Sequence, residues 1–288
     1  MLSTAEQIKK YVVEIPRGVR EYPKEWENLP DSPEILYAIG DVSLLRRRKF
    51  VIIGSRRTPS AAIKLGETIA RELTSSFAIV TGTADGGDTA AIEGALNGGV
   101  ICLLAGGFSA VPQGNLPLLE RVAKKGLLLS VHPFDASVRT FSYEYRNKLL
   151  AAIGEGVLVL GAGEKSGSLI TAKYAEKFEK PIFALPYPPN TATGAGCNDL
   201  LKKGGRLTEN AEDILSFYGL NGASCREKPS LSSDEEKIYQ ALQEETESHI
   251  SELSLKTGIP VFKLRAVLSA LEVKGLTVSL GGNRYSVV

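Results

Sequence analysis

The chain has 288 residues, of which 43% are apolar and 23% charged, and 34 Lys and Arg against 33 Asp and Glu leave a net charge of +1. That length suits one large domain or two modest ones, and the charge balance excludes a polycationic coat or tail but allows a local basic pocket. The N-terminus lacks the apolar run of a signal peptide, and no stretch approaches the roughly 18 apolar residues of a membrane span. The cysteines are far apart, at Cys102, Cys197 and Cys225. We therefore expect a reduced, cytoplasmic protein without structural zinc.

Residues 1–45 are too few for a domain of their own, so we expect them to pack on the domain that follows. The large apolar side chains available for that contact are Tyr22, Trp26, Leu36 and Tyr37.

Residues 46–218 alternate short apolar runs with longer amphipathic segments. The runs consist mostly of β-branched residues and leucine, which is typical of strands buried on both faces. They cover residues 50–53, 78–80, 100–104, 127–130, 157–160 and 181–185. Between them lie stretches with helical spacing, such as residues 61–73. The alternation predicts an α/β domain with a doubly wound, mostly parallel sheet.

The C-terminal part has a different pattern. Residues 219–233 are polar, contain glycine and proline and show no apolar periodicity, which indicates a linker. Residues 234–288 begin with helical segments, and Pro260 stands where proline is favoured, at the first position of a helix. Two strand-like segments then flank residues 281–283, a Gly-Gly-Asn sequence typical of a hairpin turn. Three helices followed by a hairpin predict a small winged helix-turn-helix domain.

Glycine- and hydroxyl-rich loops follow four of the predicted strands, at residues 54–60, 81–88, 105–107 and 161–168. Because parallel strands end at one edge of a sheet, these loops should converge where ligands bind. Helix N-termini that follow such loops offer unpaired N–H groups to an anion. One such loop could serve only as a tight turn, but four on one edge favour a site for a phosphate-bearing ligand.

The first loop matches neither a dinucleotide fingerprint nor a Walker A sequence. It offers two guanidinium groups instead, from Arg56 and Arg57, which suit phosphate diesters. Residues 141–148 interleave aromatic side chains with cations, a mixture that stacks bases and neutralises phosphates. The spacing alone equally allows an amphipathic helix whose aromatic residues lie in the core.

Candidate catalytic groups are few. His132 and His249 have neither metal-ligand spacing nor an evident nucleophile nearby. Asp85 and Asp88 could form a carboxylate pair, but Asp88 better fits a helix N-cap. The hydroxyl residues at 166, 168 and 171 have no evident base nearby that would make them nucleophiles. They are better suited to donating hydrogen bonds to a phosphate. The sequence therefore favours a binding protein without a cofactor over an enzyme.

Five short motifs occur in order along this part of the chain. They are Gly54-Ser55-Arg56 with Ser60, residues 82–88, residues 146–148, residues 166–173, and residues 196–200 with Gly204-Gly205. In this order they resemble the DNA-processing protein A (DprA/Smf) family, and Ser-Gly-Ser-Leu-Ile-Thr-Ala at residues 166–172 is fairly specific on its own. The chain departs from the family pattern at Gly87, Ile92, Gly161, Pro186-Tyr187 and Val111-Pro112, which marks a divergent member.

The resemblance implies an extended Rossmann-like domain that binds and protects incoming single-stranded DNA, forms a homodimer and loads the RecA recombinase during natural transformation, part of competence and DNA recombination. Together, the loops and the resemblance assign DNA and phosphate contacts to Gly54, Ser55, Arg56, Arg57, Ser60, Gly82, Gly86, Arg146, Asn147, Lys148, Ser166, Gly167, Ser168, Thr171, Lys173 and Asn198.

Two alternatives stay open. One is a nucleotide-binding enzyme of the same superfamily, a nucleoside monophosphate phosphoribohydrolase, although residues 161–168 do not have the arrangement of tandem glycine, threonine and glutamate that marks such an enzyme. The other is a regulator that reads duplex DNA with its winged helix. Residues 229–288 hold six Lys or Arg and eight Asp or Glu, a net charge of −2, which suits phosphate contact poorly. Lys263 and Arg265 do lie on the third helix, but we predict a protein-interaction or regulatory module that adds little to DNA affinity.

Overall fold

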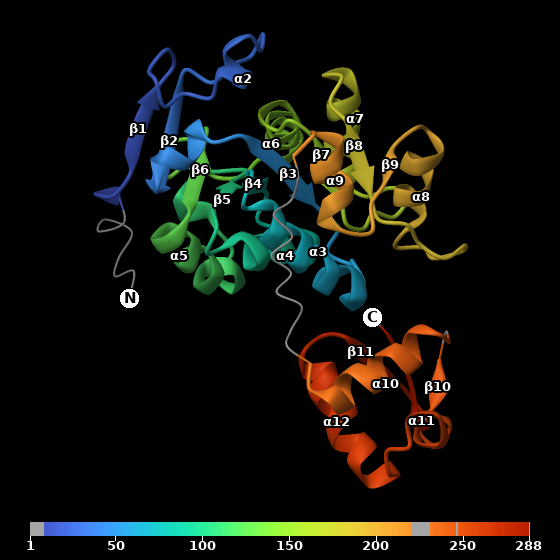
Figure 1. The fold of residues 1–288 in the computed structure, drawn as a ribbon. Coiled ribbons are helices and arrows are strands. Elements are labelled where there is room, and N and C mark those ends of the chain that lie inside the picture. The colour runs from blue at the N-terminus through green and yellow to red at the C-terminus, as the bar shows by residue number, and fades with distance from the viewer. Residues whose placement is uncertain (1–8, 221–230, 246, 288) are drawn as a thin grey trace. The chain divides into compact units, whose positions relative to one another are not determined.

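A computed structural model describes residues 9–220, 231–245 and 247–287, and its contacts divide the chain into two compact units, Met1–Gly222 and Ala223–Val288. Cys225 and most of the predicted linker lie outside the described residues. Figure 1 shows the helices and strands of both units.

The first unit is built on a nine-stranded sheet with the strand order β1-β2-β6-β5-β4-β3-β7-β8-β9. The strands are β1 (Val13–Pro16), β2 (Ile35–Gly40), β3 (Lys49–Ile53), β4 (Ala78–Thr81), β5 (Val100–Leu103), β6 (Leu127–Ser130), β7 (Val157–Val159), β8 (Ile182–Ala184) and β9 (Arg206–Leu207). All neighbours from β6 to β9 are parallel, whereas β1 and β2 pair antiparallel with each other and β2 with β6. The mostly parallel sheet predicted from the sequence is confirmed.

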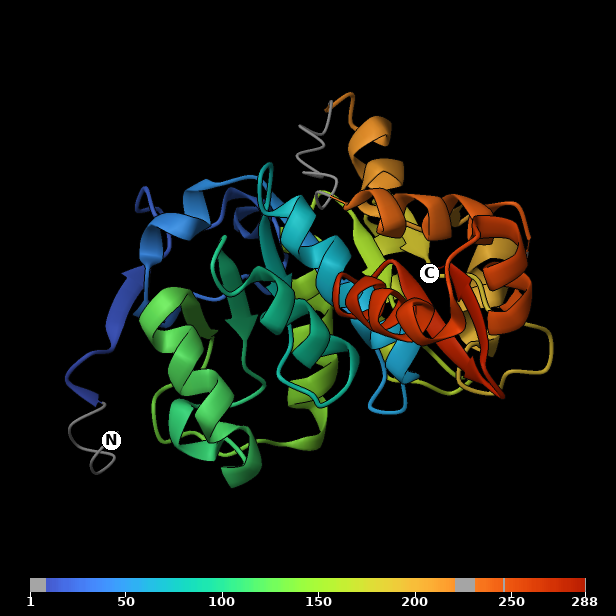
Figure 2. The ribbon, with the colours of Figure 1, turned by 60° about the horizontal axis from the view of Figure 1, so that its bottom comes forward.

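Helices cover both faces of this sheet. They are α2 (Lys24–Glu27), α3 (Ser60–Leu73), α4 (Gly87–Ala95), α5 (Leu116–Lys125), α6 (Thr140–Ile153), α7 (Ser168–Lys177), α8 (Ala195–Lys202) and α9 (Ala211–Phe217). Side chains of α3, α4, α5 and α9 pack in one core with Phe50 and Ile52 of β3, while those of α2, α6, α7 and α8 pack in the other with Val51 and Ile53. Neighbouring residues of a strand point to opposite faces, so one apolar strand supplies both cores. Figure 2 shows α3 and α4 side by side on their face.

The N-terminal segment adds two strands and a helix to this unit. Trp26 of α2 is fully buried, and its Nε1 donates a hydrogen bond to the carbonyl of Leu149 at 2.9 Å. Burying an aromatic side chain of this size contributes about 1.5–3 kcal/mol, so Trp26 anchors the segment. The buried Nζ of Lys49 adds an ion pair of 2.9 Å with Glu25. Strands β1 and β2 were not predicted, because β1 is short and exposes three of its four side chains.

The second unit has three helices, α10 (Ser233–Gln243), α11 (Ile250–Thr257) and α12 (Val261–Val273), and a three-stranded sheet. Its strands are β10 (Ser248–His249), β11 (Thr277–Gly281) and β12 (Arg284–Val287). The core consists mainly of aliphatic side chains from the three helices. This arrangement confirms the predicted winged helix-turn-helix. Pro260 precedes α12 as its N-cap instead of occupying the first helical position.

Among the described residues, no helix combines the length and the apolar composition that crossing a lipid bilayer requires.

Candidate functional site

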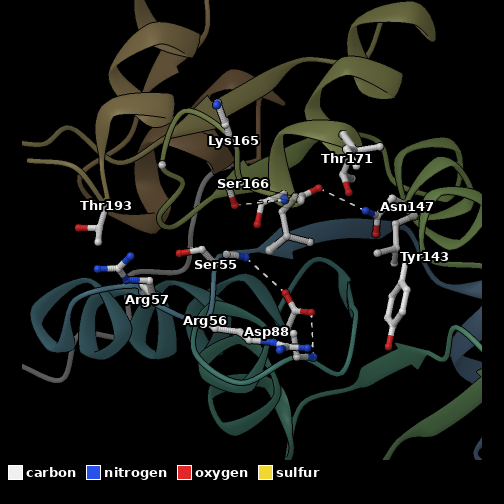
Figure 3. Close-up of a pocket in the computed structure, with 18 of the residues that line it drawn as sticks. Ser55, Arg56, Arg57, Asp88, Tyr143, Asn147, Lys165, Ser166, Thr171 and Thr193 are labelled. Carbon is white, nitrogen blue, oxygen red and sulfur yellow. Dashed lines mark hydrogen bonds between the residues drawn. The ribbon is translucent and has the colours of Figure 1, made fainter. Parts of the chain in front are cut away.

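The first unit has a cavity of about 530 Å³ at the carboxyl ends of its parallel strands (Figure 3). It lies where the strand order reverses, because β4 follows on one side of β3 and β7 lies on the other. Loops after β3, β4, β7 and β8 and the first turns of α6 and α7 form its walls. This is the position at which doubly wound folds bind ligands, as the loop positions predict.

Most of the residues that the sequence assigned to the site lie together in this cavity. They are Gly54, Ser55, Arg56, Arg57, Arg146, Asn147, Ser166, Gly167, Ser168 and Thr171. Arg56 and Arg57 are exposed, and neither forms a salt bridge within the described part of the chain. Figure 3 shows Arg57 beside Thr193 at one end of the cavity and Tyr143 at the other.

Besides Asn198, three assigned polar side chains lie outside the cavity walls. Lys148 forms an ion pair with Asp31 of the N-terminal segment. Lys173 is an exposed residue of α7, and Ser60 is exposed at the start of α3. If these three residues contact DNA, they do so on the surface outside the cavity.

Asn198, Gly82 and Gly86 do not line the cavity but support the loops that form it. The amide of Asn198 accepts a hydrogen bond from the backbone N–H of Tyr187 at 3.0 Å and donates one to its carbonyl at 2.9 Å, which fixes the loop after β8. Gly82 faces the side chains of Arg146 and Asp88 so closely that a Cβ would collide with both. Gly86 has a φ of +84° against the backbone of Ser55, a conformation that favours glycine.

A buried pair of opposite charges forms the floor of the cavity. Asp88 is 4% exposed, and its carboxylate accepts hydrogen bonds from the backbone N–H of Gly54 at 3.3 Å and of Ala84 at 3.2 Å. The sequence suggested that Asp88 is an N-cap, but Gly86 is the N-cap of α4 and Asp88 instead ties two loops together. Burial raises the pKa of Asp88, and the guanidinium of Arg146 opposes that rise.

Arg146 presents an unused donor at this floor. It is 8% exposed, and its Nη1 donates to the carbonyl of Leu103 at 3.3 Å. Its Nε is buried without a hydrogen-bond partner, as is the Oγ of Ser55. Burial lowers the pKa of Arg146, and Asp88 opposes that fall. Buried donors without partners are uncommon, and here they line a space large enough for a ligand.

The loop before α7 adds further polar groups. The Oγ of Ser166 accepts a hydrogen bond from the backbone N–H of Ser168 at 3.3 Å, and α7 begins at Ser168. Asn147 Nδ2 donates to the carbonyl of Gly167 at 3.2 Å, which joins α6 to this loop. The first N–H groups of α7 therefore stand at the cavity wall, where an anion would be stabilised.

Segment 141–148 proves to face in two directions. Phe141 is 61% exposed and Tyr143 48% exposed, and Tyr143 lines the cavity. Tyr145 turns the other way, and its hydroxyl donates to the carbonyl of Asp31 at 2.6 Å. The exposed ring of Tyr143 fits base stacking, whereas Phe141 is not among the residues that line the cavity. Tyr145 fits the alternative of an aromatic side chain that packs within the protein.

Several lining residues were not assigned from the sequence. Lys165, Gly163 and Asp88 stand in loops that were singled out, whereas Ala192 and Thr193 belong to the loop after β8, whose hydroxyl residues and Gly194 were the available signal. The apolar lining by Ile53, Ala84, Leu150 and Ile170 carries no sequence signal distinct from ordinary core.

A family model described as DNA recombination-mediator protein A matches residues 15–219. The chain belongs to this family. A second model, the DprA winged helix domain, matches residues 223–283. The chain is 33% identical over 206 residues to the DNA processing protein DprA of Bacillus subtilis, covering 70% of this chain and 69% of that protein. It spans 66% of the length of a DprA-type relative from Mycobacterium tuberculosis, at 32% identity over 85% of this chain.

Solved structures of the family have the same fold. DNA processing protein A from Streptococcus pneumoniae superposes with a TM-score of 0.68 at 27% identity, covering 74% of this chain and 77% of that one. The protein from Helicobacter pylori, whose structure concerns its single-stranded DNA binding mode, gives a TM-score of 0.66 at 32% identity, covering 72% and 95%.

Proposed function

We propose that this protein binds single-stranded DNA in the cavity of its first unit. The observation that carries the proposal is that exposed cations and apolar walls meet in one space. Arg56, Arg57 and Lys165 would hold phosphates at the rim, and the apolar walls would receive a base. The hydroxyl and amide groups of Ser166, Thr171 and their neighbours would bond to the sugar, base or phosphate oxygens.

The exposed aromatic ring of Tyr143 favours a single strand over a duplex. A base can stack on Tyr143 only where its face is free, as it is in single-stranded DNA. The relative from H. pylori, whose structure concerns a single-stranded DNA binding mode, supports this choice.

The floor of the cavity favours binding over hydrolysis. The carboxylate of Asp88 already accepts hydrogen bonds from two backbone N–H groups and faces Arg146. A glycosidic hydrolase needs a carboxylate that can reach water or a leaving group. We therefore propose a binding protein that needs no cofactor.

Filter binding with one oligonucleotide, offered single-stranded and as a duplex at the same salt concentration, tests the proposal. We expect tighter binding of the single strand and a strong fall in affinity with salt. Incubation with AMP should release no free adenine. Preference for the duplex would contradict the proposed DNA site, and release of adenine would support the hydrolase.

We propose further that the bound strand is passed to a RecA-type recombinase during natural transformation, and that the protein acts as a homodimer. Family membership supports both points. The recombinase should assemble faster on protein-bound single strands, and light scattering should give twice the mass of one chain. A monomeric mass would contradict the proposed homodimer, and an unchanged rate of recombinase assembly would contradict the proposed transfer of the strand.

Truncation after Ser224 should change single-stranded DNA affinity by no more than a few-fold. The removed residues hold eight Lys or Arg against nine Asp or Glu, and three of these cations pair with carboxylates of the same unit, so the removed part adds little positive charge for phosphate contact. Filter binding of the truncated and full chains measures the effect. A hundredfold loss would show that the winged helix takes part in DNA binding.

A further inference from the structure

The third helix of the second unit, α12, carries an outward stripe of four exposed residues. Phe262 is 75% exposed and Val273 is 89% exposed, and the two smaller residues between them, Ala266 and Ser269, are also exposed. Their spacing of four, three and four residues places them on one side of the helix. The opposite side, which carries Leu264, Leu268 and Leu271, is fully buried. We call these four exposed residues the α12 stripe.

Two cations border this stripe. Lys263 and Arg265 are exposed, and neither forms a salt bridge with another described residue. Three other cations of the unit are already neutralised: Lys274 pairs with Glu235 at 2.7 Å and Arg284 with Glu247 at 3.0 Å, and Lys256 pairs with Glu245. Lys237, on α10, is exposed and forms no salt bridge with another described residue. Within residues 231–245 and 247–287, two of the three cations without a salt bridge therefore stand beside the apolar stripe.

The spacing is that of a short coiled-coil seam. In a heptad, residues four and three apart form the apolar seam, and the positions directly beside it carry the charges that select a partner helix. The α12 stripe occupies the seam positions, and Lys263 and Arg265 fall on its two borders. Ala266 and Ser269 are small, so the middle of the seam leaves room for a large apolar side chain.

We propose that the α12 stripe docks an amphipathic helix of a partner protein, with apolar residues at three- and four-residue spacing and carboxylates on both borders. Phe262 and Val273 pack against the partner's apolar residues, and Lys263 and Arg265 pair with its carboxylates. Complementary border charges give such a contact its selectivity.

Duplex DNA fits this surface less well. Phosphate contact needs several free cations, and Arg284, which lies on the wing strand β12, is held by Glu247. A lipid surface is likewise a poor fit, since anionic membranes are recognised by clusters of about four to eight cations. A large exposed aromatic residue such as Phe262, with unpaired cations beside it, is instead typical of a protein contact.

The experiment screens the full chain against a displayed library of random 16-residue peptides and then measures a synthetic peptide with the enriched sequence by fluorescence anisotropy. We expect acidic peptides with apolar residues at the stated spacing. Phe262→Ser should lower the affinity for the synthetic peptide about tenfold or more, and the double variant Lys263→Glu with Arg265→Glu should not bind it. Leu255→Ser is the matched control, because Leu255 is 86% exposed on α11 and not part of the stripe.

These substitutions lie on the surface and spare the core, so the variants should keep the wild-type circular dichroism spectrum. Absence of enrichment on the wild-type chain would overturn the proposal, as would enrichment of basic peptides or equal binding by the Phe262→Ser variant. A change in oligomeric mass on Phe262→Ser would assign the stripe to a second copy of the chain. Loss of duplex binding on reversal of the two charges would assign it to DNA. Either result would overturn the proposal that the stripe binds a helix of a partner protein.

Discussion

Replacing Arg56 by alanine is expected to weaken single-stranded DNA binding about tenfold at about 0.1 M salt. A hydrogen bond to a charged group contributes about 1.5–3 kcal/mol, and about 1.4 kcal/mol corresponds to a factor of ten. Arg56 lines the cavity and has no competing salt bridge within the described residues. Removal of one phosphate contact should also lower the slope of log affinity against log salt by about one unit, equally for oligonucleotides of different sequence.

Two further variants delimit this effect. Arg71→Ala makes the same chemical change at the exposed C-terminal end of α3, a helix that contributes no residue to the cavity walls, and should leave affinity within about twofold. Lys148→Ala probes the edge of the site, since the sequence assigned Lys148 a phosphate contact and the structure pairs it with Asp31. Equal binding by the Arg56→Ala variant and wild type would show that DNA does not use this cavity.

The position of Lys148 shows what sequence reasoning can extract from a motif and what it misses. Residues 143, 146, 147 and 150 are three and four positions apart on α6, and all four line the cavity. Lys148 is two positions from Arg146, about 200° around the helix, so both cannot face the same space. Helical periodicity in this segment therefore suffices to separate the residues that line the cavity from Lys148.

Other features depend on tertiary packing and had no local signal. The six buried strands were predicted because both of their faces are apolar, whereas β9 has two exposed residues and could not be recognised. Asn198 was assigned to DNA by motif, yet its amide is bonded to the backbone of Tyr187, a contact that only the fold brings about. The role of Asp88 likewise depends on a second loop reaching Gly54, 34 residues away in the chain.

The buried charge pair on the cavity floor, Asp88 and Arg146, contributes to the stability of the first unit. Arg146→Ala should lower the free energy of unfolding by about 3–5 kcal/mol, because it leaves the buried carboxylate of Asp88 without its opposing charge. Urea denaturation at neutral pH, followed by circular dichroism, measures the change. Arg71→Ala again serves as the control and should unfold within about 0.5 kcal/mol of wild type.

The pH dependence of this loss follows from the raised pKa of Asp88. A carboxyl whose pKa is higher in the folded than in the unfolded state lowers stability as pH rises through the unfolded value, because the folded state then holds the extra proton. Without Arg146 the pKa of Asp88 rises further, so the difference between Arg146→Ala and wild type should be smaller at pH 5 than at pH 8. Adding Asp88→Asn removes the stranded charge and should recover part of the loss at pH 8. If the two substitutions were instead additive, with no change between pH 5 and pH 8, Arg146 would stabilise the floor by packing and not by compensating Asp88.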